Sequence, residues 1–250
     1  MSHVAKIIWN SVGVLIGLGL MVAAIVWGYR STPTQEPCAA LHYNIYGESD
    51  TAYITTGELN KMLTDEDIYP VGRAVNRISL HRIEQCIGHH PMVRNAECYL
   101  TCNNTVEVSI DQRIPIVSLW TRDGAFLIDT ERRIVPNRYR IKEWTLQARL
   151  QSSFHTIAEP LADFAEWVMD HPYWQQRIKY IEVKSPTNVR LHLTNTPSVI
   201  VLGALRDYDR KLAKLRTFFE QGKEELGDKQ YEELDIRFRG QVVGRGLINQ

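Results

Sequence analysis

The N-terminal stretch carries the strongest hydrophobic pattern in the chain. No charged residue occurs between Lys6 and Arg30, and most positions from Ile7 to Trp27 are apolar. A helix of this length spans about 30 Å, which is the thickness of the hydrocarbon core of a bilayer. Because a helix satisfies its own backbone hydrogen bonds, one such segment can cross lipid alone. The pattern therefore predicts a single transmembrane helix at residues 7–29.

Two further features of this stretch allow more than one interpretation. The small residues Val22-Ala23-Ala24 would fit a cleaved signal peptide, but apolar residues continue after them, which favours an anchor that is retained. Gly13 and Gly17 have the GxxxG spacing that lets another helix approach closely, although glycine is common in membrane helices generally. The head at residues 1–6 is short and easier to leave in the cytoplasm than to translocate. We expect a cytoplasmic N-terminus and a linker at 30–38.

The pattern then alternates between strand and helix periods over residues 39–113. Apolar residues at every second position predict three strands. Thr55 and Glu58 have the spacing of a capping box, and Ser79 is a good N-cap, so one helix is expected to begin at each site. The expected strands are 40–47, 96–100 and 106–111. This order predicts a small α+β domain, with two helices covering one face of a three-stranded sheet.

From residue 114 to residue 245 the chain reads as short strands separated by turns, with two helices. We expect a second domain built on an antiparallel sheet with flanking helices, followed by a tail at 246–250. Its expected strands are 116–120, 125–128, 134–135, 178–183, 189–193, 199–202 and 231–238, and its expected helices are 161–168 and 207–221, with Gly222 as the stop. In the last strand, Leu234, Ile236 and Phe238 are expected to face the core, and Asp235 and Arg237 to face outward.

The composition of the chain argues against nucleic-acid binding and against a zinc site. The 29 basic and 29 acidic residues balance, so no global field would attract nucleic acid. The cysteines form no C-x-x-C pair, and no histidine pair has the usual zinc spacing. Two interpretations stay open for them, buried free thiols or a disulfide between Cys86 and Cys98 in an oxidising compartment. The four cysteines are Cys38, Cys86, Cys98 and Cys102.

A search for catalytic chemistry in the sequence finds no group of residues that would support it. The histidines are scattered, the serines lack a nucleophile elbow, and carboxylate pairs such as Glu224-Glu225 lie in polar surface stretches. There is no phosphate-binding loop and no dinucleotide-binding glycine pattern. We therefore predict no catalytic, cofactor-binding or metal-binding residue, no small-molecule substrate, and a protein that is not an enzyme.

Several short motifs, in order, resemble one family. The run from His90-Pro91 to Cys98 and the run Val106-x-Val108-x-Ile110-x-Gln112-Arg113-x-Pro115 are similar to the POTRA domain of the bacterial division protein family FtsQ/DivIB. Gly124-x-Phe126-Leu127-Ile128-Asp129 resembles the first hairpin of that family's second domain. Lys211-Leu212-x-Lys214-Leu215 and the segment 231–243 resemble its closing helix and strands. One departure is visible, since Glu131-Arg132 stands where many relatives have glycine in the hairpin turn.

The resemblance implies a non-enzymatic, single-pass scaffold of the inner membrane at the division septum, with its bulk in the periplasm. Such a scaffold would bind FtsB- and FtsL-like proteins and link them to the septal wall synthase complex. An unpaired edge at the terminal strand could bind a partner by strand addition. The candidate contact residues are Asp235, Arg237, Arg239, Gly240, Gln241, Val242, Val243 and Arg245. The alternatives are a membrane-tethered cell-wall enzyme and a POTRA-type chaperone or adaptor outside division.

Overall fold

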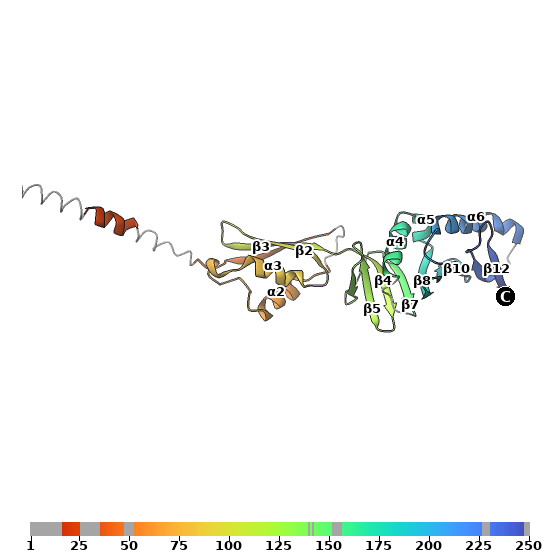
Figure 1. The fold of residues 1–250 in the computed structure, drawn as a ribbon, viewed down its shortest axis with the longest axis horizontal. Helices are drawn as coiled ribbons and strands as arrows, with labels where there is room; N and C mark the ends of the chain where they lie inside the picture. The colour runs from red at the N-terminus through yellow and green to blue at the C-terminus, as the bar shows by residue number, and fades with distance from the viewer. Residues whose placement is uncertain are drawn as a thin grey trace, which may run out of the picture.

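The computed structural model describes residues 17–25, 36–47, 53–139, 141, 143–151, 157–226 and 231–247. Residues 17–25, part of the predicted membrane segment, are helical and exposed. The rest of that segment, including Gly13, lies outside the described residues. Within the described ranges, no helix combines the length and the apolar character needed to span a bilayer. Two sheets follow, and the domains built on them lie end to end along the molecule (Figure 1).

The first domain is the predicted three-stranded sheet with its two helices. The strands lie in the order β1-β3-β2, with β1 parallel and β2 antiparallel to the central strand β3. The elements are β1 (Ala40–Tyr46), α2 (Thr56–Asp65), the short 3-10 helix η1 (Val75–Arg77), α3 (Leu80–Gly88), β2 (Val93–Leu100) and β3 (Thr105–Gln112). The alternation in β3 is confirmed, since Val106, Val108 and Ile110 are fully buried.

Local chemistry explains where these helices and the hairpin begin and end. The Thr55 hydroxyl accepts the Glu58 N–H at 3.3 Å, and the Glu58 carboxylate accepts the Thr55 N–H at 3.1 Å, so the predicted capping box is confirmed. The Ser79 hydroxyl accepts the Arg82 N–H at 3.4 Å at the start of α3. Asn104 turns the β2–β3 hairpin with a φ of 57°, a conformation that asparagine tolerates.

The second domain holds one nine-stranded sheet, in the order β12-β11-β10-β9-β8-β7-β4-β5-β6. Three neighbouring pairs are parallel, namely β4 with β7, β7 with β8 and β10 with β11, so the expectation of an antiparallel sheet was wrong. The strands are β4 (Pro115–Thr121), β5 (Gly124–Asp129), β6 (Ile134–Pro136), β7 (Leu146–Leu150), β8 (Ile178–Ser185), β9 (Asn188–Leu193), β10 (Val199–Gly203), β11 (Tyr231–Asp235) and β12 (Val243–Leu247).

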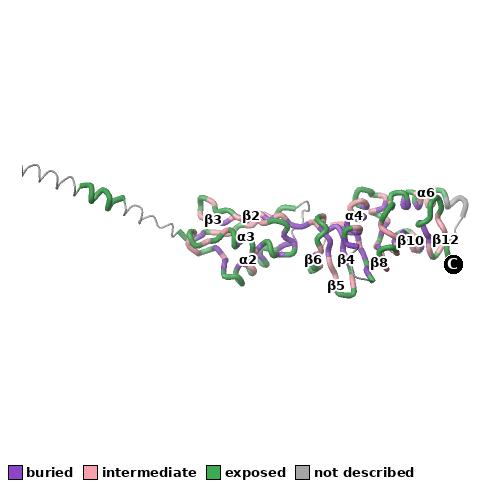
Figure 2. Tube along the Cα trace, viewed as in Figure 1, coloured by how far each residue is buried: buried purple, intermediate pink, exposed green. Residues whose placement is uncertain are grey.

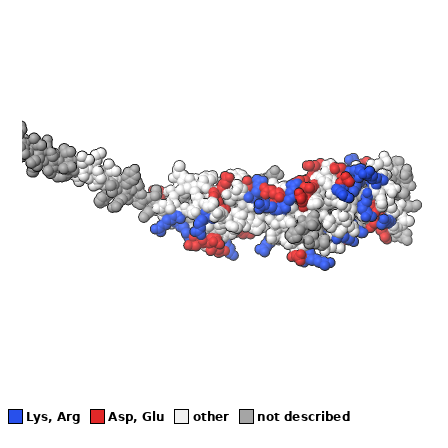
Figure 3. Space-filling model, viewed as in Figure 1, with Lys and Arg blue, Asp and Glu red and all other residues white. Residues whose placement is uncertain are grey.

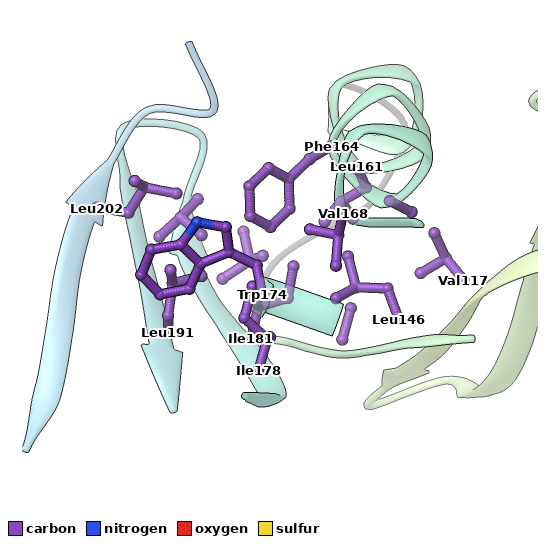
Figure 4. Packing of buried hydrophobic residues seen from close by; sticks show 14 of the residues in the cluster. Val117, Leu146, Leu161, Phe164, Val168, Trp174, Ile178, Ile181, Leu191 and Leu202 are labelled. Carbon is purple, nitrogen blue, oxygen red and sulfur yellow. The ribbon is translucent and has the colours of Figure 1, made fainter. Parts of the chain in front are cut away.

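Helices cover one face of this sheet. They are α4 (Ala158–Met169), α5 (Pro172–Gln175) and α6 (Tyr208–Leu226). The helix α6 runs past Gly222, so the predicted stop there was wrong. Phe164 of α4 and Trp174 of α5 pack over the buried side chains of the strands, including Ile181 and Leu191 (Figure 4). Leu212 and Leu215 of α6 are fully buried. Figure 2 shows that buried residues occur in both domains, while residues 17–25 are exposed.

The two domains share buried residues where they meet. Leu127 of β5 and Val135 of β6 belong to the hydrophobic cluster of the first domain. Arg113, which follows β3, donates to the Asp129 carboxylate at 2.7 Å, and the two side chains are only 6% and 2% exposed. The Tyr53 hydroxyl also donates to Glu143. These contacts join the first domain to the β5–β6 end of the nine-stranded sheet.

The four cysteines are free thiols, so the structure contains no Cys86–Cys98 disulfide. Cys38 is buried, Cys86 and Cys98 are half-buried, and Cys102 is exposed. Burial, followed by the nearby Glu84 carboxylate, raises the pKa of Cys98 to about 12. This thiol is therefore protonated at neutral pH and unreactive as a nucleophile.

Candidate functional site at the C-terminal sheet edge

The last strand of the nine-stranded sheet is β12, not β11. β11 is paired on both sides, parallel to β10 and antiparallel to β12. β12 lies at the end of the strand order, and none of the described strands pairs with its outer side. The prediction that the 231–238 strand forms the edge was wrong by one strand, because the chain turns back after Gly240, whose φ is 73°.

Two glycines let β12 lie against β11. A Cβ atom on Gly244 would come within 2.5 Å of the Tyr231 ring, so the ring occupies the space above that glycine. Gly246 has a φ of 62°, and a Cβ atom there would come within 2.5 Å of the Glu232 carboxylate. Larger residues at these positions would push β12 away from β11. The edge strand therefore depends on its Gly-Arg-Gly sequence.

A buried carboxylate connects β11 to β12. Asp235 is fully buried, and the Arg237 guanidinium donates to its two oxygens at 2.9 and 2.6 Å, while Arg245 of β12 lies 3.5 Å away. Burial alone would raise the pKa of Asp235, but the Arg237 hydrogen bonds and the two positive charges outweigh it and hold the pKa below its usual value. The carboxylate is thus ionised at neutral pH. Arg237 and Arg245 are about half exposed, so their outer faces meet solvent.

Two lysines of α6 hold the ends of β10 and β11. The Lys214 ammonium donates to the Ile236 carbonyl at 3.0 Å and also to the Phe238 carbonyl, and Lys211 donates to the Ala204 carbonyl at 2.9 Å. Burial lowers the pKa of both lysines. Lys214 thereby fixes the start of the loop 236–242, which presents Phe238 at 43% exposure.

The opposite edge of the nine-stranded sheet, and one edge of the first sheet, are obstructed. β6 has only three residues, ends at Pro136, and buries Val135 against the first domain. Proline cannot donate a ladder hydrogen bond, so β6 is a poor template for a further strand. On β2, the Cys98 N–H donates to the Glu84 carboxylate of α3 at 2.8 Å. Of the two described edges of the nine-stranded sheet, β12 alone lacks such an obstruction.

Comparison with known families matches both domains. Residues 36–111 match a family model described as a POTRA-like domain. Residues 114–245 match the model described as FtsQ/DivIB, C-terminal related, which covers more than half of the chain. The chain belongs to the FtsQ/DivIB family. No curated protein matches it. Membership of the FtsQ/DivIB family marks it as a cell division protein and agrees with the order of motifs noted in the sequence.

The structure of this FtsQ/DivIB chain separates the candidate contact residues into groups. Asp235 was expected to face a partner, but it is fully buried beneath two arginines and is structural. Phe238 was expected in the core, but it lies exposed after the end of β11. Of the remaining candidates, Arg237, Arg239, Gly240, Gln241 and Arg245 are exposed, while Val242 and Val243 are half-buried. Gly17 has no atom near its Cβ position, and Gly13 is outside the described residues.

Sequence reasoning missed the edge strand, because the last predicted strand ended at Phe238, before Gly244, and because Gly246 and Leu247 were assigned to a tail. A signal was present, since glycine inside a short apolar run often marks a bulge or a close backbone approach. It also missed the role of Lys214, although the Lys-Leu-x-Lys-Leu motif was part of the family resemblance. Within the described residues, no cluster of histidine, cysteine, aspartate or glutamate could hold a metal ion.

Proposed function

We propose that this FtsQ/DivIB chain is a non-enzymatic scaffold that binds FtsB- and FtsL-like division proteins by strand addition to β12. The observation that supports it is the unpaired outer side of β12 at the end of a nine-stranded sheet. An edge strand offers main-chain donors and acceptors that an extended partner segment can pair with. Main-chain pairing would supply affinity, and the exposed Arg245, Leu247 and Phe238 side chains would supply specificity.

The proposal includes the location of the protein. The apolar run at residues 7–29 would anchor the chain once in the inner membrane, with a cytoplasmic N-terminus and with both domains in the periplasm at the septum. Single-pass anchoring would keep both domains on one side of the inner membrane. Through them the scaffold would connect to the septal wall synthase complex and so influence peptidoglycan synthesis.

Charge on the visible surface suits a protein-binding scaffold. Acidic and basic side chains alternate over the face in Figure 3, with no extended region of one sign. This mixture agrees with the balance of 29 basic and 29 acidic residues. A surface of this kind avoids nonspecific attraction to nucleic acid and leaves recognition to local contacts.

Co-purification from membranes tests the proposal. We expect FtsB- and FtsL-like proteins to purify with the full chain and to be lost when residues 243–250 are deleted, because that deletion removes β12. Deleting residues 248–250 is the matched control, since all of β12 remains, and partner recovery should be unchanged. Circular dichroism of both variants would verify folding. Undiminished recovery with the folded 243–250 deletion would overturn the proposal.

A further inference from the structure

A hollow lies between the helices α2 and α3 of the first domain, which pack against each other (Figure 1). It encloses about 490 Å³, a size within the range of small-molecule sites. All of its lining residues belong to α2, to α3 or to the segment 66–68, and they lie in the continuous described range 53–139. It is separate from the β12 edge, which belongs to the other domain.

The less exposed part of the hollow is apolar. It is formed by Met62 of α2, by Ile68, which is only 8% exposed, and by Cys86 of α3. Burial is the largest of the effects that raise the pKa of the Cys86 thiol, so this group is uncharged at neutral pH. A surface of this kind favours contact with an apolar side chain, because that contact removes apolar area from water.

The α2 side of the hollow carries negative charge at an unfavourable place. Asp65 is the last residue of α2, and Glu66 is its C-cap. Unpaired carbonyl groups give a helix C-terminus a partial negative charge, which favours cations there and disfavours carboxylates. The last turn of α2 holds no basic residue, and neither carboxylate has an ion-pair or hydrogen-bond partner in the described part of the chain. This side of the hollow therefore favours a cationic group such as an ammonium.

The α3 side carries the opposite charge, again at an unfavourable place. Arg82 lies in the first turn of α3, where the helix dipole favours an anion, and that turn has no acidic residue. The pKa of the Cys86 thiol is raised by Glu66 and lowered by Arg82, so both charged groups lie near this thiol. No ion pair joins Glu66 to Arg82 among the described residues. The Arg82 side of the hollow therefore favours a carboxylate.

We propose that this hollow binds a short peptide with free termini. Its ammonium group would lie at the C-terminus of α2, its carboxylate beside Arg82, and an apolar side chain on the surface formed by Met62, Ile68 and Cys86. Packed helices lie about 8–10 Å apart, and an extended residue spans about 3.5 Å, so two or three residues fit between the charged sides. A single amino acid is too short, and an internal protein segment offers no charged termini.

The charge placement is the observation that distinguishes this hollow from an ordinary groove between helices. Both helix ends depart from the local charge rule, and such departures are expected where function requires them. A zwitterionic peptide would place a favourable charge at each helix end. The inference rests neither on the proposed membrane location nor on partner binding at β12.

Titration of the full chain in detergent with the tripeptide Ala-Leu-Ala tests the inference. The methionine methyl groups are labelled with 13C; the chain has five methionines, and the Met62→Leu variant identifies the Met62 signal by its disappearance. We expect the tripeptide to shift that signal in a saturable way. Acetylating its amino end or amidating its carboxyl end should each weaken binding about threefold, which is the scale of one exposed ion pair.

Variants of the protein assign each end of the peptide. Arg82→Gln should bind the free tripeptide and its C-terminal amide equally well. The double variant Asp65→Asn and Glu66→Gln should bind the free and the N-acetylated tripeptide equally well. Lys61→Gln, which changes an exposed cation of α2 outside the hollow, is the matched control and should keep both preferences. Thermal melts verify folding, and none of the charge variants at the hollow should melt below the wild type, because the removed charges oppose the helix dipoles.

Three results would overturn the inference. The first is no shift of the Met62 signal with the tripeptide. The second is equal binding of a tripeptide capped at both ends, which would assign the hollow to an internal protein segment. The third is a retained preference of Arg82→Gln for the free carboxylate. The variants at the hollow should still co-purify with division partners, so failure of the titration would leave partner binding at β12 unaffected.

Discussion

The two edges of the nine-stranded sheet differ in whether they are covered. At the β6 end, Val135 is buried against the first domain and Pro136 ends the strand. At the β12 end, no described strand covers the outer side, and Leu247 is 55% exposed. One end of the sheet is therefore closed by the neighbouring domain, and the other is available to a partner.

Each end also contains a buried aspartate paired with arginine. Asp129 at the closed end pairs with Arg113, and both side chains are buried. Asp235 at the open end is fully buried, but its partners Arg237 and Arg245 are 46% and 55% exposed. The closed pair has no face left for another molecule. At the open end the carboxylate holds β11 and β12 together while the arginines remain accessible.

The largest effect is expected from breaking the closed pair. Arg113→Ala leaves Asp129 buried without its cation, and we expect a loss of about 3–5 kcal/mol in the free energy of unfolding. Urea denaturation of the full chain measures it. Arg122→Ala, an exposed arginine in the β4–β5 turn, is the control and should change stability by less than about 0.5 kcal/mol. A loss below about 1 kcal/mol for Arg113→Ala would contradict a structural role for the pair.

A smaller effect is expected from Asp235→Asn at the open end. The arginines released by this change can reach water, so we expect a loss of about 1.5–3 kcal/mol at neutral pH. Because the folded state lowers the pKa of Asp235, its contribution is present above the unfolded pKa near 3.9 and is lost as pH falls through the lower folded pKa. The stability of the wild type should therefore fall more steeply with acidification than that of Asp235→Asn. Equal slopes in denaturation series below pH 4 would argue against this assignment.

The smallest effect concerns the hairpin turn at the closed end. Arg132 has a φ of 64°, and its guanidinium binds Asp163 and Glu166 of α4, each at 2.8 Å. Arg132→Ala loses these exposed ion pairs but keeps the unfavourable φ, so we expect a loss of about 0.5–1 kcal/mol. Arg132→Gly loses the same pairs but adopts that φ without strain. Thermal melts should rank the glycine variant above the alanine variant, and the reverse order would refute this explanation.

Local patterns were enough to predict most elements. The Thr55–Glu58 capping box, the Ser79 cap and the alternation of Val106, Val108 and Ile110 depend on neighbours in sequence, and all are confirmed. β7 was not predicted, because its short Leu-Gln-Ala-Arg-Leu run has no β-branched residue. Its insertion between β4 and β8 is a long-range parallel pairing that sequence neighbours do not specify.

The candidate site was predicted only in outline. The alternation in the predicted strand placed Asp235 on the face opposite to that of Leu234. It did not predict that Arg237, and Arg245 from the next strand, cover Asp235. In the sequence, Phe238 continues the apolar alternation of Leu234 and Ile236, but β11 ends at Asp235. With Glu131-Arg132 in place of glycine, the sequence did not predict the shape of the turn after β5. In the structure, Arg132 adopts a positive φ in this turn.

Amide hydrogen exchange on the full chain, with and without an FtsB-like partner, tests the central claim most directly. Strand addition at β12 predicts slower exchange in residues 243–247 when the partner is bound, with no change in residues 134–136 at the closed end. Protection at 134–136, or unchanged exchange at 243–247 under saturating partner, would contradict the assignment of β12 as the binding edge.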